Sequence, residues 1–151
     1  MTLVIEKTSD LPSYVGKELG KSEWFAVEQD RINLFADATE DHQFIHIDEE
    51  AAKLTPFGTT IAHGFLTLSL VPRLVQDIYR VADVKMGVNY GLNRVRFLNP
   101  VKVGSRVQAS AVIKEVGEAA GGTQVILEVT IAIEGEEKPA CVAEFISLVY
   151  A

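Results

Sequence analysis

Residues 35–72 read FADATEDHQFIHIDEEAAKLTPFGTTIAHGFLTLSLVP, and the last third of this stretch decides the fold. From His63 to Val71 the apolar residues cover nearly the whole circumference of a helix, and only two small polar residues interrupt them. A helix that is apolar on all sides is buried within the protein. The sequence therefore predicts a central buried helix, which Pro72 is expected to bend because proline lacks a backbone N–H.

The chain after residue 84 can enclose this helix, because it consists almost entirely of strand-like segments. Strands are predicted over residues 84–97, 106–116, 123–134 and 140–150, and the third of these segments alternates cleanly between apolar and polar residues. Short turns such as EGEEKP separate them, so successive strands should pair antiparallel. We therefore predict an α+β fold in which a curved antiparallel β-sheet wraps around a long central helix. The exposed edges of such a sheet favour pairing with a second copy of the chain.

The segments before the central helix are more varied. Residues 1–21 are expected to be mostly loop with one helical turn, and residues 22–27 a short strand. A helix is expected from about residue 28 to residue 39, which leaves residues 41–46 in the loop after it. Asp48 is placed to cap a further short helix.

Length and composition limit the function. With 151 residues, a single domain over residues 1–151 is expected. The net charge of −7 argues against a protein that binds nucleic acid or anionic membranes. Cys141 is the only cysteine, which excludes an internal disulfide and fits a reducing compartment. The N-terminal residues lack the pattern of a signal peptide and no apolar run is long enough to span a membrane, so a cytoplasmic protein is expected.

All three histidines lie in the quoted stretch, and one of them has a carboxylate close by in sequence. Asp41 and His46 are separated by four residues and could flank one water molecule. An imidazole exchanges a proton near neutral pH, and a carboxylate beside it can orient water or act as the second acid or base. The spacing is also open to a structural interpretation, in which Asp41 caps a turn and His46 is an ordinary loop residue.

A metal site is a further alternative, with four candidate ligands: His42, His46, Asp48 and His63. The histidines do not follow a standard zinc-binding spacing, and no clear third ligand is paired with them. We therefore expect no metal ion.

Ala62-His63-Gly64 stands directly before the buried helix. Glycine lets a ligand approach the backbone closely, and the first N–H groups of a helix can bind negative charge. These donors could stabilise a carbonyl oxygen that gains charge during a reaction, or Gly64 could simply allow close packing against the sheet. Together with the acid–imidazole pair, this pattern favours water addition to, or hydrolysis of, a polarised carbonyl compound. The chemistry of the residues does not choose between those two reactions.

The segments FADATEDHQFIHID and PFGTTIAHGFLTLSL together resemble the MaoC-like, (R)-specific enoyl-CoA hydratase family of the hot-dog fold, and within it the nodulation-protein-N-like branch. NYGLNRVRFLNPVKVGSRV and KPACVAE are similar to the same family, so the resemblance covers roughly residues 15–150. It implies a hot-dog fold, a homodimer, and reversible syn addition of water to a trans-2-enoyl-CoA to give the (R)-3-hydroxyacyl-CoA. It implies no metal or redox cofactor.

The resemblance also implies roles for individual residues. By position, Asp41 and His46 match the catalytic pair that holds the water and shares the general acid and base roles. Gly64 matches the backbone donor to the thioester oxygen, and His63 is expected to shape the approach to it. His42 is expected to be a bystander.

The chain departs from the usual family motif beside this pair. The family commonly has glycine before the aspartate and Asn-Pro two residues after it, and here these places hold Glu40, Gln43 and Phe44. Losing glycine and proline changes the backbone freedom of the loop. Gln43 keeps an amide, so it is expected to supply the same hydrogen bonds through a longer arm.

Other parts of the substrate have weaker candidates. Four basic residues could meet the phosphates of CoA or form a solvated strand face: Arg94, Arg96, Lys85 and Lys102. Four apolar residues could line an acyl tunnel, although core packing explains each singly: Phe57, Phe65, Leu66 and Leu68.

Two other activities fit the same resemblance. One is a hot-dog acyl-CoA thioesterase, and the other is a non-catalytic subunit that binds acyl thioesters. Enoyl chains carried on acyl carrier protein are a further substrate possibility.

Overall fold

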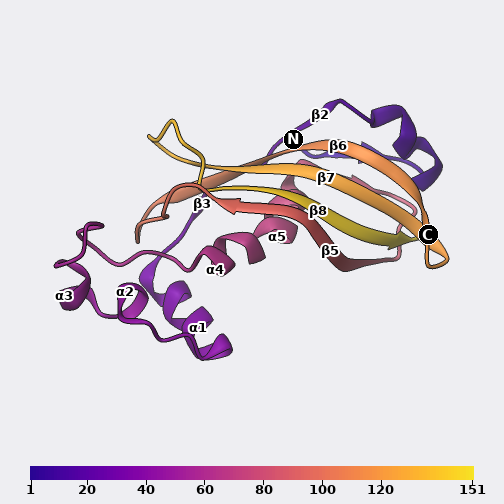
Figure 1. Cartoon of the computed structure of the whole chain (residues 1–151). Coiled ribbons are helices and arrows are strands. Elements are labelled where there is room, and N and C mark those ends of the chain that lie inside the picture. The colour runs from indigo at the N-terminus through magenta and orange to yellow at the C-terminus, as the bar shows by residue number, and fades with distance from the viewer.

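The computed structural model describes all 151 residues, and a six-stranded antiparallel sheet dominates it, curving over the helices (Figure 1). The path of the sheet is β2-β6-β7-β8-β5, and β3 pairs with β6 beside this path. Its strands are β2 (Glu18–Lys21), β3 (Phe25–Ala26), β5 (Met86–Phe97), β6 (Arg106–Ala119), β7 (Gly122–Ile133) and β8 (Cys141–Tyr150). The predicted antiparallel pairing of successive strands is confirmed for β6 with β7 and for β7 with β8. It is wrong for β5 and β6, because β5 pairs antiparallel with β8 instead.

The central helix consists of two pieces, α4 (Gly64–Ser69) and α5 (Val71–Ile78). They are separated at Leu70, and Pro72 lies in the first turn of α5, where its missing N–H has no partner to lose. The bend expected at Pro72 is therefore found two residues earlier, at Leu70. The prediction that residues 63–71 form a helix buried on every side was wrong, because the Phe65 side chain remains 66% exposed. The Phe65 ring lies edge-on to Phe97 at the end of β5, with the ring centroids 5.8 Å apart.

The core lies between α5 and the concave face of the sheet. Val107, Ala109, Ala111 and Ile113 of β6 point into it, and the alternate residues of β7 from Val125 to Ile133 do the same. From α4 and α5, Leu66, Val71, Leu74 and Ile78 complete the cluster. Residues at every second position of a strand share a face, so the alternation read from the sequence is the property that builds this core.

The N-terminal segment holds more structure than the sequence indicated. The residues expected to be loop form β1 (Leu3–Ile5), the 3-10 helix η1 (Thr8–Tyr14) and β2. β1 pairs in parallel with the distant β4 (Tyr79–Val81), and β2 pairs with β6. Such short strands exist only because far segments supply their hydrogen-bond partners, and a local sequence pattern does not contain that information.

Three helices lie between β3 and α4 in the chain: α1 (Gln29–Thr39), α2 (Phe44–Ile47) and α3 (Glu49–Ala52). They gather at one end of the sheet, next to α4 (Figure 1). Asp48 caps α3 as predicted, since its Oδ1 accepts the N–H of Ala51 at 3.0 Å. The prediction that residues 41–46 form a loop holds for Asp41 but not for His46, which lies on α2.

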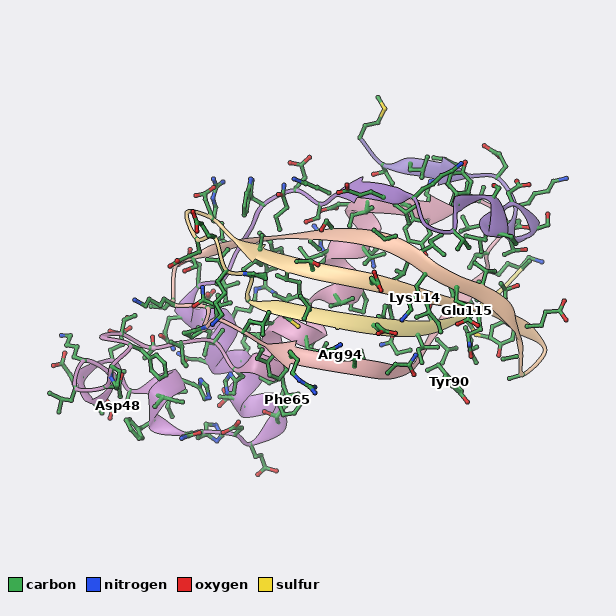
Figure 2. All side chains as sticks on the ribbon, turned by 45° about the horizontal axis from the view of Figure 1, so that its top comes forward. Asp48, Phe65, Tyr90, Arg94, Lys114 and Glu115 are labelled. Carbon is green, nitrogen blue, oxygen red and sulfur yellow. The ribbon has the colours of Figure 1, made fainter.

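β5 is the free edge of the sheet, and its side chains are unusually open. Tyr90 and Leu92 are 62% and 42% exposed, and Figure 2 shows Tyr90 and Phe65 along this side of the molecule. A long edge strand with exposed apolar side chains is a template for pairing with another chain. No helix of the protein is both long enough and apolar enough to cross a membrane.

Candidate active site

Three elements bring Asp41, His46 and His63 together. Asp41 lies in the loop after α1, His46 lies on α2, and His63 lies directly before α4. One donor atom from each of the three side chains lies within 4.8 Å of the others. The two residues predicted to act as a pair are therefore neighbours in space, and the structure adds a second histidine to them.

Backbone groups fix the ring of His46. Its Nδ1 lies 2.8 Å from the carbonyl oxygen of Ile61. Because a carbonyl oxygen only accepts, Nδ1 carries the hydrogen, and Nε2 is left with a free lone pair. His46 is 6% exposed, so the free nitrogen is held in a largely dry setting. This tautomer is the one that can take a proton from a water molecule.

Gln29, at the start of α1, anchors the backbone around His46. Its side-chain Nε2 donates to the carbonyl oxygen of His46 at 2.7 Å and to Asn33 Oδ1 at 2.9 Å. Its Oε1 accepts the hydroxyl of Thr60 at 2.5 Å. Thr60 precedes Ile61, the residue that holds the His46 ring. This role was not predicted, because a glutamine in the first turn of a helix carries no sequence signal of its own.

His63 packs behind the pair. Its Nε2 donates to the backbone carbonyl oxygen of Asp41 at 3.0 Å, and its ring stacks on the ring of His46 with the centroids 3.8 Å apart and the planes 20° from parallel. The ring of Phe35, on α1, packs against the ring of His63 with the two centroids 4.9 Å apart. The Nδ1 of His63 is buried without a hydrogen-bond partner.

The surroundings lower the pKa of His46 below its usual 6.5. Burial is the largest cause, because it disfavours the charged ring, and His63 adds to the lowering. The hydrogen bond to Ile61 and the charge of Asp41 act in the opposite direction. The net result favours a neutral imidazole, which is the form that accepts a proton.

The three clustered side chains do not suit a metal ion. The lone pairs of an imidazole lie in the plane of its ring, and the rings of His46 and His63 are stacked almost parallel. Their lone pairs therefore run side by side instead of converging on one point, as coordination would require.

A cavity of about 350 Å³ opens beside His46. It is mostly apolar, and His46 is the only titratable side chain in its wall. The lining residues are Ile45, His46, Phe57, Ile61, Ala62, Gly64, Thr67, Phe97, Leu98, Asn99, Pro100, Val101 and Ala140. A cavity of this kind, apolar with few polar groups, is typical of a small-molecule site.

Gly64 lines the same cavity as His46. A Cβ at this position would lie 2.9 Å from Phe97 Cδ2, so no larger residue fits without moving the Phe97 ring. Gly64 is also the first residue of α4, where the backbone N–H has no acceptor within the helix. No backbone hydrogen bond outside the regular elements involves this N–H.

The residues that replace the usual motif have definite places. Glu40 ends α1 in the left-handed conformation, with φ at 61° and ψ at 26°. Glycine adopts this conformation without strain, which explains why the family commonly has glycine there. The N–H of Gln43 lies 3.4 Å from Asp41 Oδ1, and its carbonyl oxygen accepts the N–H of His46 at 3.0 Å. Gln43 thus connects the pair through its backbone.

The other candidates lie away from the cavity. His42 is exposed and pairs with Asp37 at 2.9 Å. Arg94 lines a separate hollow on the sheet together with Glu128 and Glu144, while Arg96 Nη1 donates to the carbonyl of Val95 at 2.7 Å. Figure 2 shows Arg94 on the sheet, at a distance from the helical end that holds Asp48.

Of the four apolar tunnel candidates, only Phe57 lines the cavity. Leu66 is buried in the core and Phe65 is exposed. Leu68 borders a second hollow of about 290 Å³ between α5 and β5.

Comparisons with known proteins agree with this architecture. The family model described as MaoC like domain matches residues 10–135. The chain is 52% identical to 3-hydroxyacyl-thioester dehydratase Z of Mycobacterium tuberculosis (strain ATCC 25618 / H37Rv) over 142 residues, covering 93% of this chain and 94% of the relative. It is 50% identical to Nodulation protein N of Rhizobium leguminosarum bv. viciae, covering 93% of this chain and 89% of the relative.

Among solved structures, the (R)-hydratase from A. caviae involved in PHA biosynthesis superimposes with a TM-score of 0.72 at 25% identity, covering 88% of this chain and 94% of that chain. The α+β architecture is therefore the hot-dog fold that the resemblance implied. On the family match and the two curated relatives, the chain belongs to the MaoC-like dehydratase family.

Proposed function

We propose that this protein is an (R)-specific enoyl-CoA hydratase, which adds water reversibly to trans-2-enoyl-CoA and gives (R)-3-hydroxyacyl-CoA. One observation carries the proposal: a single titratable side chain, His46, faces an apolar cavity, and Asp41 lies beside it. Hydration of an enoyl thioester needs one water molecule, a group to take its proton and a dry pocket for the acyl chain. The curated relative named for 3-hydroxyacyl thioesters supports the substrate class.

In the hydration direction, Asp41 and His46 hold the water molecule between them. The free Nε2 of His46 takes a proton from the water, and the oxygen forms a bond to C3 of the enoyl chain. The double bond shifts its electrons toward the thioester carbonyl, and C2 then receives a proton from the same pair. Delivery of both hydrogen and hydroxyl from one side of the substrate gives syn addition.

Negative charge develops on the thioester oxygen during this step. The backbone N–H of Gly64 is proposed to donate to that oxygen from the first turn of α4. A preorganised donor of this kind is typically worth a factor of about 100 to 1,000 in rate. The close approach of Phe97 to Gly64 supports this role, because it leaves no room for a side chain that would displace the oxygen.

Arg96 is better placed than Arg94 to meet the CoA phosphates. Arg94 lies beside Glu128 and Glu144, whereas the hydrogen bond that the Arg96 guanidinium makes is to the neutral backbone carbonyl of Val95. A free guanidinium could meet the phosphate of CoA or that of acyl carrier protein alike, since both carriers present one.

A homodimer is proposed to form along β5. This strand has 12 residues and is a free edge of the sheet, so a second copy can pair with it and cover the exposed apolar residues. Such pairing would also cover Phe65, which explains why an apolar residue of the central helix is open in the single chain.

The direct test is hydration of crotonyl-CoA and longer enoyl-CoAs, followed by the loss of the enoyl thioester absorbance. Wild-type protein should be active, and Asp41→Asn and His46→Gln should each lose at least about 100-fold in kcat. His42→Gln is the matched control, because His42 is exposed and outside the cavity. Release of free thiol would instead identify a thioesterase. Binding of acyl-CoA without turnover would identify a non-catalytic subunit.

A further inference from the structure

We infer that His63 is a positioning residue for the Asp41–His46 pair, holding the backbone of one partner and the ring of the other from behind the cavity. This inference rests on the proposed function. His63 is 2% exposed and is absent from the cavity wall, so it acts through its neighbours and not on the substrate.

The first contact fixes Asp41. This residue is exposed in the loop between α1 and α2, and the only hydrogen bond to its carboxylate within the chain is the long one from Gln43. Its position therefore depends on its backbone, and the N–H of His63 Nε2 donates to its carbonyl oxygen at 3.0 Å. Without that donor, the carboxylate would lose its fixed distance from His46.

The second contact fixes the plane of His46. The hydrogen bond from Nδ1 to Ile61 holds one point of the ring, but it leaves the ring free to tilt about that bond. The ring of His63 lies flat against it at 3.8 Å and prevents this tilt. Phe35 in turn covers His63 at 4.9 Å. The stack thereby fixes the direction in which the free Nε2 of His46 points.

A third observation points in the same direction. The Nδ1 of His63 is buried without a partner, and burying an unpaired polar atom is destabilising. A smaller or apolar residue would avoid that cost. The site keeps the histidine because it combines a flat ring with a donor at the far end, and no other side chain offers both in this volume.

Two variants separate the contacts. His63→Gln keeps an N–H donor for the carbonyl of Asp41 but removes the ring, and His63→Phe keeps a ring for the stack but removes the donor. Each should lower kcat about 10-fold, and His63→Ala should lower it roughly 100-fold, with KM unchanged. His42→Gln again serves as the matched control. Circular dichroism and thermal melting establish that each variant is folded.

A second readout does not require activity. Asp41 and His63 are the titratable groups that face His46, while α1 presents the uncharged Gln29 and the cavity side presents no titratable group. Since His63 lowers the pKa of His46, NMR titration of the His46 ring in His63→Gln should show a higher pKa. His42→Gln should leave it unchanged.

The outcomes are distinguishable. Wild-type kcat together with an unchanged His46 titration in His63→Gln and His63→Phe would overturn the inference. A raised KM with unchanged kcat would also overturn it, because that result indicates direct contact with the substrate. If the wild-type protein hydrates no enoyl thioester, the proposed function fails, and the NMR titration alone decides the role of His63.

Discussion

Gly64 and Phe97 are in contact so close that a methyl group on Gly64 would lie 2.9 Å from the Phe97 ring. The contact joins the first turn of α4 to the end of β5, and both residues line the cavity. It makes Gly64→Ala informative, because the added methyl group must displace either the helix terminus or the ring.

Gly64→Ala should reduce kcat/KM by about 10- to 100-fold, since it shifts the proposed donor N–H away from the substrate oxygen. Phe97 is 46% exposed, so shortening it makes room. The double variant Gly64→Ala/Phe97→Leu should therefore recover most of the loss relative to Phe97→Leu alone. If Gly64→Ala lowered kcat/KM by the same factor with and without Phe97→Leu, the clash with Phe97 would not be the cause of the loss. Steady-state hydration kinetics measure this.

Gln29→Leu should destabilise the protein by about 1–3 kcal/mol, because it leaves the fully buried Thr60 hydroxyl without its acceptor. It should also lower kcat, since the carbonyl of His46 loses its donor. Asn33→Leu is the control, because it removes only the exposed contact to Gln29. Urea unfolding gives the stability, and a wild-type midpoint in Gln29→Leu would contradict the expectation.

Glu40→Gly should stabilise the fold by up to about 1 kcal/mol, because glycine adopts a positive φ without the strain that a side chain creates. Ala38→Gly, two residues earlier within α1, should have the opposite effect by about 1 kcal/mol. Thermal melting distinguishes them. If both substitutions lowered the melting temperature, the left-handed conformation of Glu40 would not be a source of strain.

The hydration rate should stay high below pH 6.5, because the pKa of His46 is lowered from that value by burial. The lowered pKa of His46 also makes the stability depend on pH. Between pH 6.5 and the lower pKa of folded His46, this residue binds fewer protons in the folded protein than in the unfolded chain. Unfolding free energy should accordingly decrease from pH 6.5 downward, until His46 is protonated in the folded state too. His46→Gln should remove this part of the pH dependence, as measured by denaturant midpoints across pH.

Leu92→Lys should weaken the proposed dimer, because it places a charge on the apolar edge strand β5. Light scattering after gel filtration should show a shift from dimer to monomer. Leu54→Lys is the matched control, since Leu54 is 90% exposed and lies outside β5. A wild-type protein that is monomeric at all concentrations would exclude the dimer.

Local patterns in the sequence determined much of this protein. The alternation in β7 established which residues face the core, and the apolar run before Pro72 established the central helix. The Asp41 and His46 candidates also came from the sequence, because the chemistry of a short segment is visible without its neighbours. These features depend on backbone period and residue type, which are local quantities.

Only the tertiary structure decided which groups stand next to the pair. The stack of His63 on His46 joins residues on separate elements, and Gln29 reaches Thr60 across 31 positions of the chain. The same holds for β1 and β2, whose partner strands lie far away in sequence. Hydrogen bonds and ring contacts between distant segments depend on how the helices pack against the sheet, and no local period encodes that packing.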